Sequence, residues 1–442
     1  MKSINKLFSI MLLIIGIGVH ATAQQRDSLK NERISIHAQA TIIEQYKPAF
    51  HVPYSGLNSL SPTTERATSV TSTLYFGVRL WEGAGFFIDP ELAGGTGLSQ
   101  VVGVADATNG ETPRIANPAP AISIARLFYR QVIALSKQQT YQASDQNQLG
   151  GTLPVSYMAF TVGQISMGDY FDDNKYSHDP RTQFMTWTLM DGGAWDYAAN
   201  TRGYAPSFVV EYITPHNEWR YAFSLLPKTA NGLEMNWDIG KSAAQTVEYT
   251  HRYVVNRHEG AIRLLGFFNR APMGNYMESI DMDPTAPNIE SSRKNGRTKY
   301  GFVINAEQAL TNDLGCFFRG SWNDGKNETW AFTEVDHSIS AGLSLDGASW
   351  HRNGDHIGLA YVTSGLSKPH RTYLADGGYG FMLGDGKLNY GWEHLTELYY
   401  SAQLIKERLF LTGAYQLLIN PGYNRDRKGP VNVFSFRLHL AI

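Results

Sequence analysis

Apolar and polar residues alternate with a period of two along several segments of this chain. In residues 34–42 every even-numbered position is apolar, and the odd-numbered positions carry Ser, His, Gln and Thr. The alternation recurs in residues 70–80 and 300–307. It is most regular in residues 434–442, where Phe, Leu and Ile alternate with Ser, Arg, His and Ala. A period of two is typical of β-strands with one apolar and one polar face.

Strands of this kind fit two architectures. In a soluble sandwich the apolar face would form the core and the polar face would meet water. In a membrane barrel the apolar face meets lipid and the polar face lines a lumen. The first alternating segment, residues 34–42, and the last, residues 434–442, are both strand-like, and such barrels close by pairing the first strand with the last. The pattern therefore favours an all-β fold, a transmembrane antiparallel β-barrel.

Two turn sequences predict hairpins, because their glycines supply the positive φ that tight turns need. They are Asn323-Asp324-Gly325 and Gly384-Asp385-Gly386. The predicted strands that flank them are 317–322 and 330–332 for the first turn, and 380–383 and 388–390 for the second.

Two stretches show little alternation. Gly83 to Pro120 is rich in Gly, Pro and Ala, and it is long enough to fold into a lumen, although a surface loop explains it equally well. Gly274 to Gly296 has acidic residues, prolines and a basic cluster, and it is expected to be an external loop. Long external loops are typical of membrane barrels.

The N-terminus has the features of a secretory leader. Lys2 and Lys6 precede an apolar run, residues 7–19, which is short for a spanning helix, and Ala21-Thr22-Ala23 is a small-residue cleavage pattern. We expect residues 1–23 to be a cleaved signal peptide and residues 24–442 to form a single barrel domain. An uncleaved anchor is the alternative.

Composition narrows the function further. With 38 basic and 40 acidic residues the net charge is -2, and no basic tract indicates nucleic acid. Cys316 is the only cysteine, so an intrachain disulfide is impossible. Zinc-protease, hydrolase and phosphate-loop motifs are missing, so we predict no cofactor and no metal. Ser367 and His370 are the one candidate pair for a barrel hydrolase, and a polar loop is the simpler interpretation.

Acidic residues are dense in residues 169–174. Asp169, Asp172 and Asp173 could bind calcium, form one side of a charged constriction, or lie in a solvated turn. Arginines occupy polar positions of the predicted strands, where opposed Arg and carboxylate groups would select solutes in a lumen. The arginines expected to line this lumen are Arg79, Arg126, Arg130, Arg263 and Arg437.

Tryptophans in the predicted lumen could contact a solute in another way. Trp81, Trp187 and Trp195 could stack on sugar rings, and an interfacial aromatic girdle is the alternative for each. Neutral polyols suit a lumen of this kind, because a hydroxyl can donate to a carboxylate and accept from a guanidinium group.

Several long blocks of the sequence resemble the carbohydrate-selective porins of Gram-negative outer membranes, the OprB-type family. They extend over nearly the whole mature chain. The blocks are residues 77–83 (GVRLWEG), 90–99 (PELAGGTGLS), 171–184, 322–334 (WNDGKNETWAFTE) and 420–427 (NPGYNRDR).

The resemblance implies a barrel of about 16 strands, passive diffusion of glucose and related sugars, and a constriction of arginines and carboxylates, with Glu82 among the lining residues. It also implies an outer-membrane location, contact with the lipid bilayer, and insertion by the outer-membrane assembly machinery. Homo-oligomerisation is left open. Outer-membrane barrels usually end in an aromatic residue, whereas this sequence ends in Ile442.

The sequence therefore predicts a passive sugar channel and no enzymatic activity. A general or ion-selective porin is the first alternative. A barrel-based enzyme or adhesin is the second.

Overall fold

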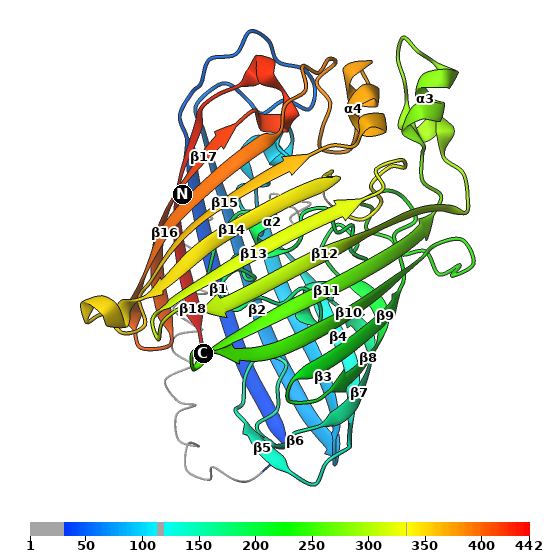
Figure 1. The fold of residues 1–442 in the computed structure, drawn as a ribbon. Coiled ribbons are helices and arrows are strands. Elements are labelled where there is room, and N and C mark those ends of the chain that lie inside the picture. Colours follow the sequence, from blue (N-terminus) through cyan, green and yellow to red (C-terminus); the bar gives the residue numbers. More distant parts are fainter. Residues whose placement is uncertain (1–30, 113–118, 333) are drawn as a thin grey trace.

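The computed structural model describes residues 31–112, 119–332 and 334–442. Sixteen antiparallel strands form one closed barrel, and a separate two-stranded hairpin lies at one end (Figure 1). The predicted barrel and its strand number are confirmed. The predicted leader, residues 1–23, lies outside the described residues.

The elements follow the chain order with few irregularities. The barrel strands are β1 (Ile34–Lys47), β2 (Glu65–Trp81), β3 (Ala84–Gly95), β4 (Ala121–Ala134), β7 (Tyr157–Ile165), β8 (Ala205–Ile213), β9 (Asn217–Ser224), β10 (Ala243–Val255), β11 (His258–Ala271), β12 (Arg297–Ala309), β13 (Leu314–Asn323), β14 (His337–Asp346), β15 (His356–Gly365), β16 (Glu393–Ile405), β17 (Leu409–Ile419) and β18 (Val431–Ala441). The separate hairpin is β5 (Gln139–Gln142) with β6 (Gly151–Pro154), and the helices are α2 (Trp187–Met190), α3 (Tyr276–Met282) and α4 (Lys368–Ala375).

Pairing of the first and last strands closes the barrel. β1 and β18 run antiparallel, with Thr41 opposite His439 and Tyr46 opposite Phe434. All other barrel neighbours are consecutive in the chain once the β5–β6 hairpin is set aside. Closure leaves no sheet edge unpaired, which a sheet exposed to lipid requires because lipid cannot supply hydrogen bonds.

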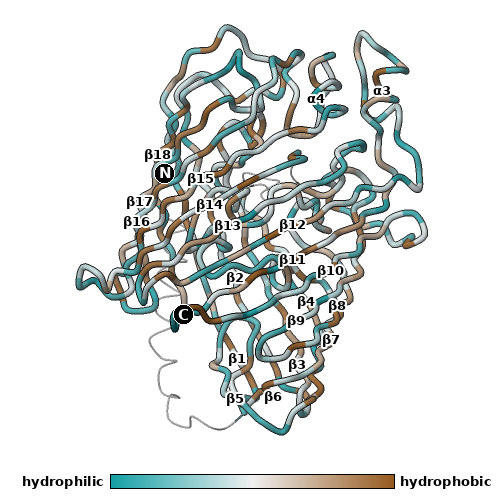
Figure 2. Tube along the Cα trace, in the orientation of Figure 1, coloured by the Kyte–Doolittle hydropathy of each residue, from teal (hydrophilic) through white to brown (hydrophobic). Residues whose placement is uncertain are grey.

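The alternation seen in the sequence corresponds to two faces of the barrel wall. On β18, Phe434 and Phe436 are 44% and 63% exposed, whereas Ser435 and Arg437 between them are buried. Ile36 on β1 is 69% exposed. The apolar residues therefore point outward, an arrangement that is stable against lipid and unfavourable in water. Hydrophobic and hydrophilic positions succeed one another along the strands in Figure 2.

The two ends of the barrel differ in their connections. At one end of the barrel, which we call the short-turn end, the strands are joined by connections of a few residues, such as 82–83, 256–257 and 406–408. β1 begins and β18 ends at this same end. The other end has long loops, and α3 and α4 lie there in Figure 1. Short periplasmic turns and long external loops are the rule in outer-membrane barrels. No helix among the described residues is long and apolar enough to cross a membrane.

One connection at the short-turn end is exceptional. Residues 135–156 contain the β5–β6 hairpin, and we call this segment the hairpin loop. It lies below the barrel in Figure 1, at the end opposite to α3 and α4. All other connections at this end, from 82–83 to 406–408, are shorter.

The structure corrects three expectations about loops and strands. Residues 84–95 show little alternation but form strand β3, because hydrogen bonding to β2 on one side and β4 on the other holds them extended. The predicted strand at 330–332 is a buried loop segment instead. Residues 380–390 form no barrel strand and belong to the external loop between β15 and β16. Residues 274–296 include α3 and lie in a loop at the long-loop end, as expected.

Candidate functional site

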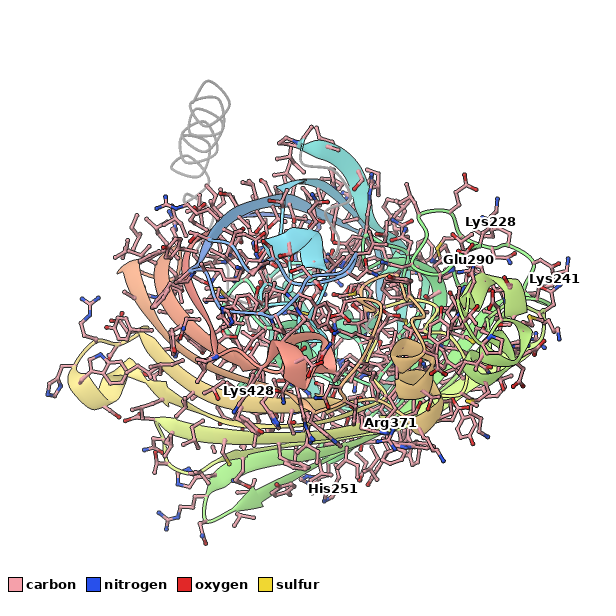
Figure 3. The ribbon with its side chains drawn as sticks, turned by 90° about the horizontal axis from the view of Figure 1, so that it is seen from above. Lys228, Lys241, His251, Glu290, Arg371 and Lys428 are labelled. Carbon is pink, nitrogen blue, oxygen red and sulfur yellow. The ribbon has the colours of Figure 1, made fainter. Side chains whose placement is uncertain are left out.

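Two loops from the long-loop end fold into the barrel. We call residues 166–204 the lumen loop; nearly all of its residues from 184 to 200 are buried. Residues 103–112 of the β3–β4 connection are also buried, and they contact the inward-facing Gln45 and Glu393. Of the two interpretations of 83–120, folding into the lumen therefore fits this described segment. Figure 3, a view down the barrel, shows side chains crowding its interior, while Lys228 and Lys241 project at its periphery.

Irregular backbone inside a barrel needs partners for its polar groups. Carboxylates of the wall provide acceptors: Glu397 on β16 accepts from the backbone N–H groups of Met185 (2.7 Å) and Thr186 (3.0 Å). Glu393 on the same strand accepts from the N–H groups of Ala105 (3.0 Å) and Asp106 (2.9 Å). These glutamates hold the two loops against one side of the wall.

Arginines of the wall satisfy loop carbonyl groups in the same way. Arg437 donates to the carbonyl oxygens of Pro180 (2.8 Å), Thr182 (2.8 Å) and Gln183 (2.7 Å) and is fully buried. Arg319 on β13 donates to the carbonyl oxygen of Leu189 at 2.9 Å. The lumen loop is thus fixed to strands β13, β16 and β18 by buried charged groups.

A cavity of about 1320 Å³ remains at the short-turn end. It lies between the hairpin loop and the inner face of strands β2, β3, β4, β7, β8 and β9. Its charged lining comes from the strands, their turns and the lumen loop. The charged residues that line it are Arg33, Arg79, Glu82, Arg126, Arg130, Asp169, Glu211 and Arg220.

The lumen loop meets the strand wall at an ion pair. The guanidinium group of Arg126 donates from Nε and Nη2 to the two oxygens of Asp169, each at 2.6 Å. Asp89 on β3 lies 3.6 Å from the same guanidinium group. Bidentate pairs of this type are strong and fix geometry, so this pair defines one edge of the cavity.

A second group of charges follows the strand register. Glu211 on β8 is directly opposite Arg220 on β9, which in turn is opposite Glu248 on β10. Arg220 contacts Glu211 at 3.5 Å, Glu218 at 2.7 Å and Glu248 at 3.7 Å. Opposed charges at paired positions stabilise neighbouring strands and leave an ordered row of alternating sign along the lumen.

Arg130 on β4 joins this row to the lumen loop. It pairs with Glu211 and lies 6.0 Å from the ring centre of Tyr170. Burial raises the pKa of the Tyr170 phenol to about 12, so the group stays protonated. The neutral phenol donates to the Thr161 hydroxyl at 3.4 Å and places an uncharged polar group beside the arginine.

A histidine and a carboxylate lie deeper in the lumen loop. The Nδ1 of His178 is 3.9 Å from Asp191. Burial and the nearby Asp172 raise the pKa of Asp191 to about 7, although His178 opposes this. Burial disfavours the charged imidazole, but the carboxylates of Asp173 and Asp191 outweigh it and raise the pKa of His178.

Among the residues that the sequence places in the pore, Asp172 and Arg437 do not line the cavity. Both are fully buried. The Asp172 carboxylate accepts from the backbone of Gly192 (2.6 Å), from Asn305 (2.6 Å) and from Arg319 (3.2 Å). Arg437 points inward from β18 and is covered by the lumen loop, whereas Asp172 belongs to that loop and contacts Asn305 and Arg319 of the wall. Asp172 and Arg437 are positioning residues for the lumen loop.

Arg263 and Asp173 lie close together, but outside the cavity. Arg263 on β11 is buried and lies 3.5 Å from Asp173 and 3.2 Å from Glu307. Arg79, on β2, does line the cavity, and it donates to the carbonyl oxygens of Glu32 (2.8 Å) and Gly150 (3.1 Å).

Trp187 and Trp195, which the sequence suggests for stacking on sugar rings, instead pack against other side chains of the barrel interior. Trp187 stacks on Phe332 at 4.1 Å between ring centres, and Trp195 packs against Phe171 and Tyr197. Both rings are buried and unavailable to a solute.

Trp81 sits at the rim of the cavity. It is 58% exposed, it lies 6.0 Å from Tyr129, and its indole N–H donates to Gln131. Tyr129 lies on the same face of β4 as the exposed Leu127, which is the outer face of the barrel. Contact with Tyr129 therefore fits Trp81 as a residue of the interfacial aromatic girdle.

Ser367 and His370 lie close in α4 but do not form a nucleophile and base. The Ser367 hydroxyl donates to the carbonyl oxygen of Gly325 at 2.6 Å and accepts from the backbone N–H of His370 as a helix cap. The His370 ring bonds Asp336 at 3.0 Å and is fully buried. In the described part of the chain, no group of three potential ligand side chains could hold a metal ion.

The sequence-based selection missed several charged residues of the cavity. Glu211 and Arg220 line it, and Glu218 and Glu248 complete the row. A signal was present: in residues 217–221 charged residues alternate with aromatic ones, so Glu218 and Arg220 share one face.

Comparisons with known proteins agree with this architecture. A family model described as carbohydrate-selective porin, OprB family, matches residues 60–441. No curated protein sequence matches the chain significantly. The high-pH structure of Pseudomonas putida OprB aligns with a TM-score of 0.70 at 16% identity, covering 93% of this chain and 94% of that one. The outer membrane channel DcaP of Acinetobacter baumannii aligns with a TM-score of 0.51 at 10% identity, covering 92% and 97%.

Proposed function

This chain belongs to the OprB family of carbohydrate-selective porins, and we propose that neutral sugars diffusing through it make contact with the charged cavity at its short-turn end. The protein is an outer-membrane β-barrel channel. The observation that carries the proposal is the Arg126–Asp169 pair beside the Arg130–Glu211–Arg220 row. Donors and acceptors held this close match the hydroxyl groups of a polyol.

Asp169, Arg126 and Arg130 are the residues to which we assign sugar contact. Arg79, Glu82 and Arg220 contribute to the charge of the same lining. Asp172, Asp173, Arg263 and Arg437 act through the lumen loop or the neighbouring wall.

The test is single-channel conductance in a planar bilayer with sugars added stepwise. Saturable reduction of the current by glucose or maltose would support both a pore and a sugar site. Steady openings that every sugar leaves unchanged would contradict sugar binding. Absence of openings from folded protein would contradict a channel.

An anion-selective general porin is the second candidate. Five arginines and three carboxylates carry the formal charge of the cavity lining, and the excess of guanidinium groups favours anions. The reversal potential in a salt gradient measures this preference. An anion-selective current that sugars leave unchanged would support the second candidate over the first.

The family and the fold are those of channels, and we propose that this protein has no enzymatic activity. The Ser367 hydroxyl is engaged with Gly325, and the His370 ring with Asp336. Ser367→Ala should therefore leave conductance and sugar block unchanged. Loss of a hydrolytic activity in this variant would instead support a barrel enzyme.

We further propose the leader at residues 1–23, a single barrel domain at 24–442, and insertion by the outer-membrane assembly machinery. The outward apolar residues support contact with lipid. A homo-oligomer through this outer surface stays a prediction, which native mass spectrometry would test.

A further inference from the structure

The hairpin loop gives the cavity a second wall of different chemistry. The residues of this loop that line the cavity include five with side-chain amides and none with a formal charge. The amide residues are Gln139, Gln142, Gln146, Asn147 and Gln148. A neutral wall of amides thus faces the arginine and carboxylate wall of the strands.

An apolar contact docks this wall inside the barrel. Leu149 is buried in a cluster with Phe87 and Phe128, whose rings stack at 4.8 Å. Gly77 and Gly85 leave the space that this contact needs, because a Cβ at either position would come within 3.0 Å of the Phe87 ring. The glycines therefore make a depression in the inner wall for Phe87 and Leu149.

Polar contacts fix the same loop at several other points. Asn147 donates to Asp89 at 2.8 Å, and Asp89 also faces Arg126. Ser144 bonds Ser35 at 3.1 Å and the His37 ring at 3.0 Å. The hairpin loop is therefore anchored to the wall, and its tip reaches the charged pair of the cavity.

We propose that this amide wall is a second sugar-binding surface, and that the solute which uses both walls at once is a neutral disaccharide or larger oligosaccharide. The inference rests on the proposed function. A side-chain amide offers a donor and an acceptor together, as a sugar hydroxyl does. Gln139 makes no side-chain hydrogen bond within the described residues, and Gln142 uses only its Nε2, toward the carbonyl oxygen of Leu149 at 3.3 Å.

The size of the cavity supports a solute longer than one ring. Its volume of about 1320 Å³ exceeds the roughly 300–1,000 Å³ of a typical small-molecule site. A monosaccharide bound at the Arg126–Asp169 pair leaves room toward the hairpin loop. A small inorganic ion gains little from uncharged amides, whereas a second sugar ring gains hydrogen bonds there.

The experiment compares glucose and maltose as blockers of single-channel current. In the variant Gln139→Met/Gln142→Met the side chains keep their length and lose their amides. The half-blocking concentration of maltose should rise about three- to tenfold, the effect of losing one hydrogen bond or two. The half-blocking concentration of glucose should change less than twofold. Stable single-channel openings without sugar would verify that the variant barrel has assembled.

Gln138→Met is the matched control, because Gln138 is an exposed neighbour in the same loop that does not line the cavity. It should behave as the unmodified protein. An unchanged maltose block in the double variant, or an equal weakening in the control, would overturn the inference while the proposed function stands. If neither sugar blocks the unmodified protein, the proposed function itself fails.

Discussion

Arg126 on β4 and Asp169 in the lumen loop meet through two parallel hydrogen bonds of 2.6 Å. The pair joins a strand to a loop that enters from the long-loop end of the barrel. The hairpin loop, from the short-turn end, reaches the same place, because Asn147 donates to Asp89, which lies 3.6 Å from the Arg126 guanidinium group. Wall, lumen loop and hairpin loop thus converge on one guanidinium group.

Arg126→Gln should weaken sugar block and shift ion selectivity toward cations. The change removes one positive charge and leaves the Asp169 carboxylate unpaired. A hydrogen bond to a charged group contributes about 1.5–3 kcal/mol, so the half-blocking concentration of glucose should rise at least about tenfold. Reversal potentials and sugar titrations in planar bilayers measure both effects. Arg66→Gln, at an exposed position of the same sheet, should alter neither.

Arg437→Met should release the lumen loop without preventing barrel assembly. Three loop carbonyl groups would lose their common donor, while β18 keeps its backbone pairing with β1 and β17 along its length. Noisier current and faster hydrogen exchange in residues 178–190 are the expected results. Steady current and unchanged exchange would show that Arg437 is not needed to hold the loop.

The lumen loop should become less stable as pH rises through neutrality. Asp191 and His178 both have raised pKa values, that of Asp191 being about 7. Each group therefore binds its proton more tightly in the folded loop than in solvent. The stabilisation that each bound proton gives to the folded loop is fully present below the ordinary pKa of the group. It is lost as pH rises through the raised pKa that the group has in the folded loop. Asp169, Asp172, Asp173 and Arg319 are the other charged groups that act on this pair.

Hydrogen exchange of residues 185–195 at about pH 5 and pH 8, corrected for the intrinsic rates, measures this dependence. Protection should be greater at the lower pH. Asp191→Asn should flatten the profile, because the amide does not titrate. Protection that increases toward pH 8 would contradict the assignment.

Leu149→Ser should detach the hairpin loop from the inner wall. The side chain is buried against Phe87, and full burial of a leucine stabilises by about 1.5–3 kcal/mol. The loop should become sensitive to protease between residues 138 and 156, and the sugar-free conductance should rise. Leu153→Ser, at a half-buried position of the same hairpin, is the control and should have a smaller effect on both.

The strands could be predicted from the sequence because their pattern is local. Residues 434–442 alternate without interruption, and β18 occupies Val431–Ala441. The segment at 330–332 was mistaken for a strand because its apolar residues follow a turn sequence. Its N–H groups instead donate to the carboxylate of Asp196, at 2.9 to 3.0 Å. That partner is more than a hundred residues away in the chain, so nothing local indicates it.

The same limit applies to the candidate site. The inward direction of Arg437 and Arg126 follows from strand parity, which the sequence shows. Which of them meets a solute depends on where the lumen loop lies, and this depends on distant contacts such as those of Glu397 with Met185. Trp187 and Trp195 were misjudged for this reason, since the loop packs their rings together.

The pairing of β1 with β18 has a consequence for biosynthesis. Thr41 and His439 bond to each other although 398 positions separate them in the chain. Contacts between residues so far apart in the sequence form late in folding, because closing a long loop costs conformational entropy before the contact stabilises the chain. One edge of β1 pairs with β2, which follows it directly, whereas its other edge stays unpaired until β18 is in place. During that interval the free edge can pair with another chain, so the order of strand pairing exposes this barrel to aggregation before it closes.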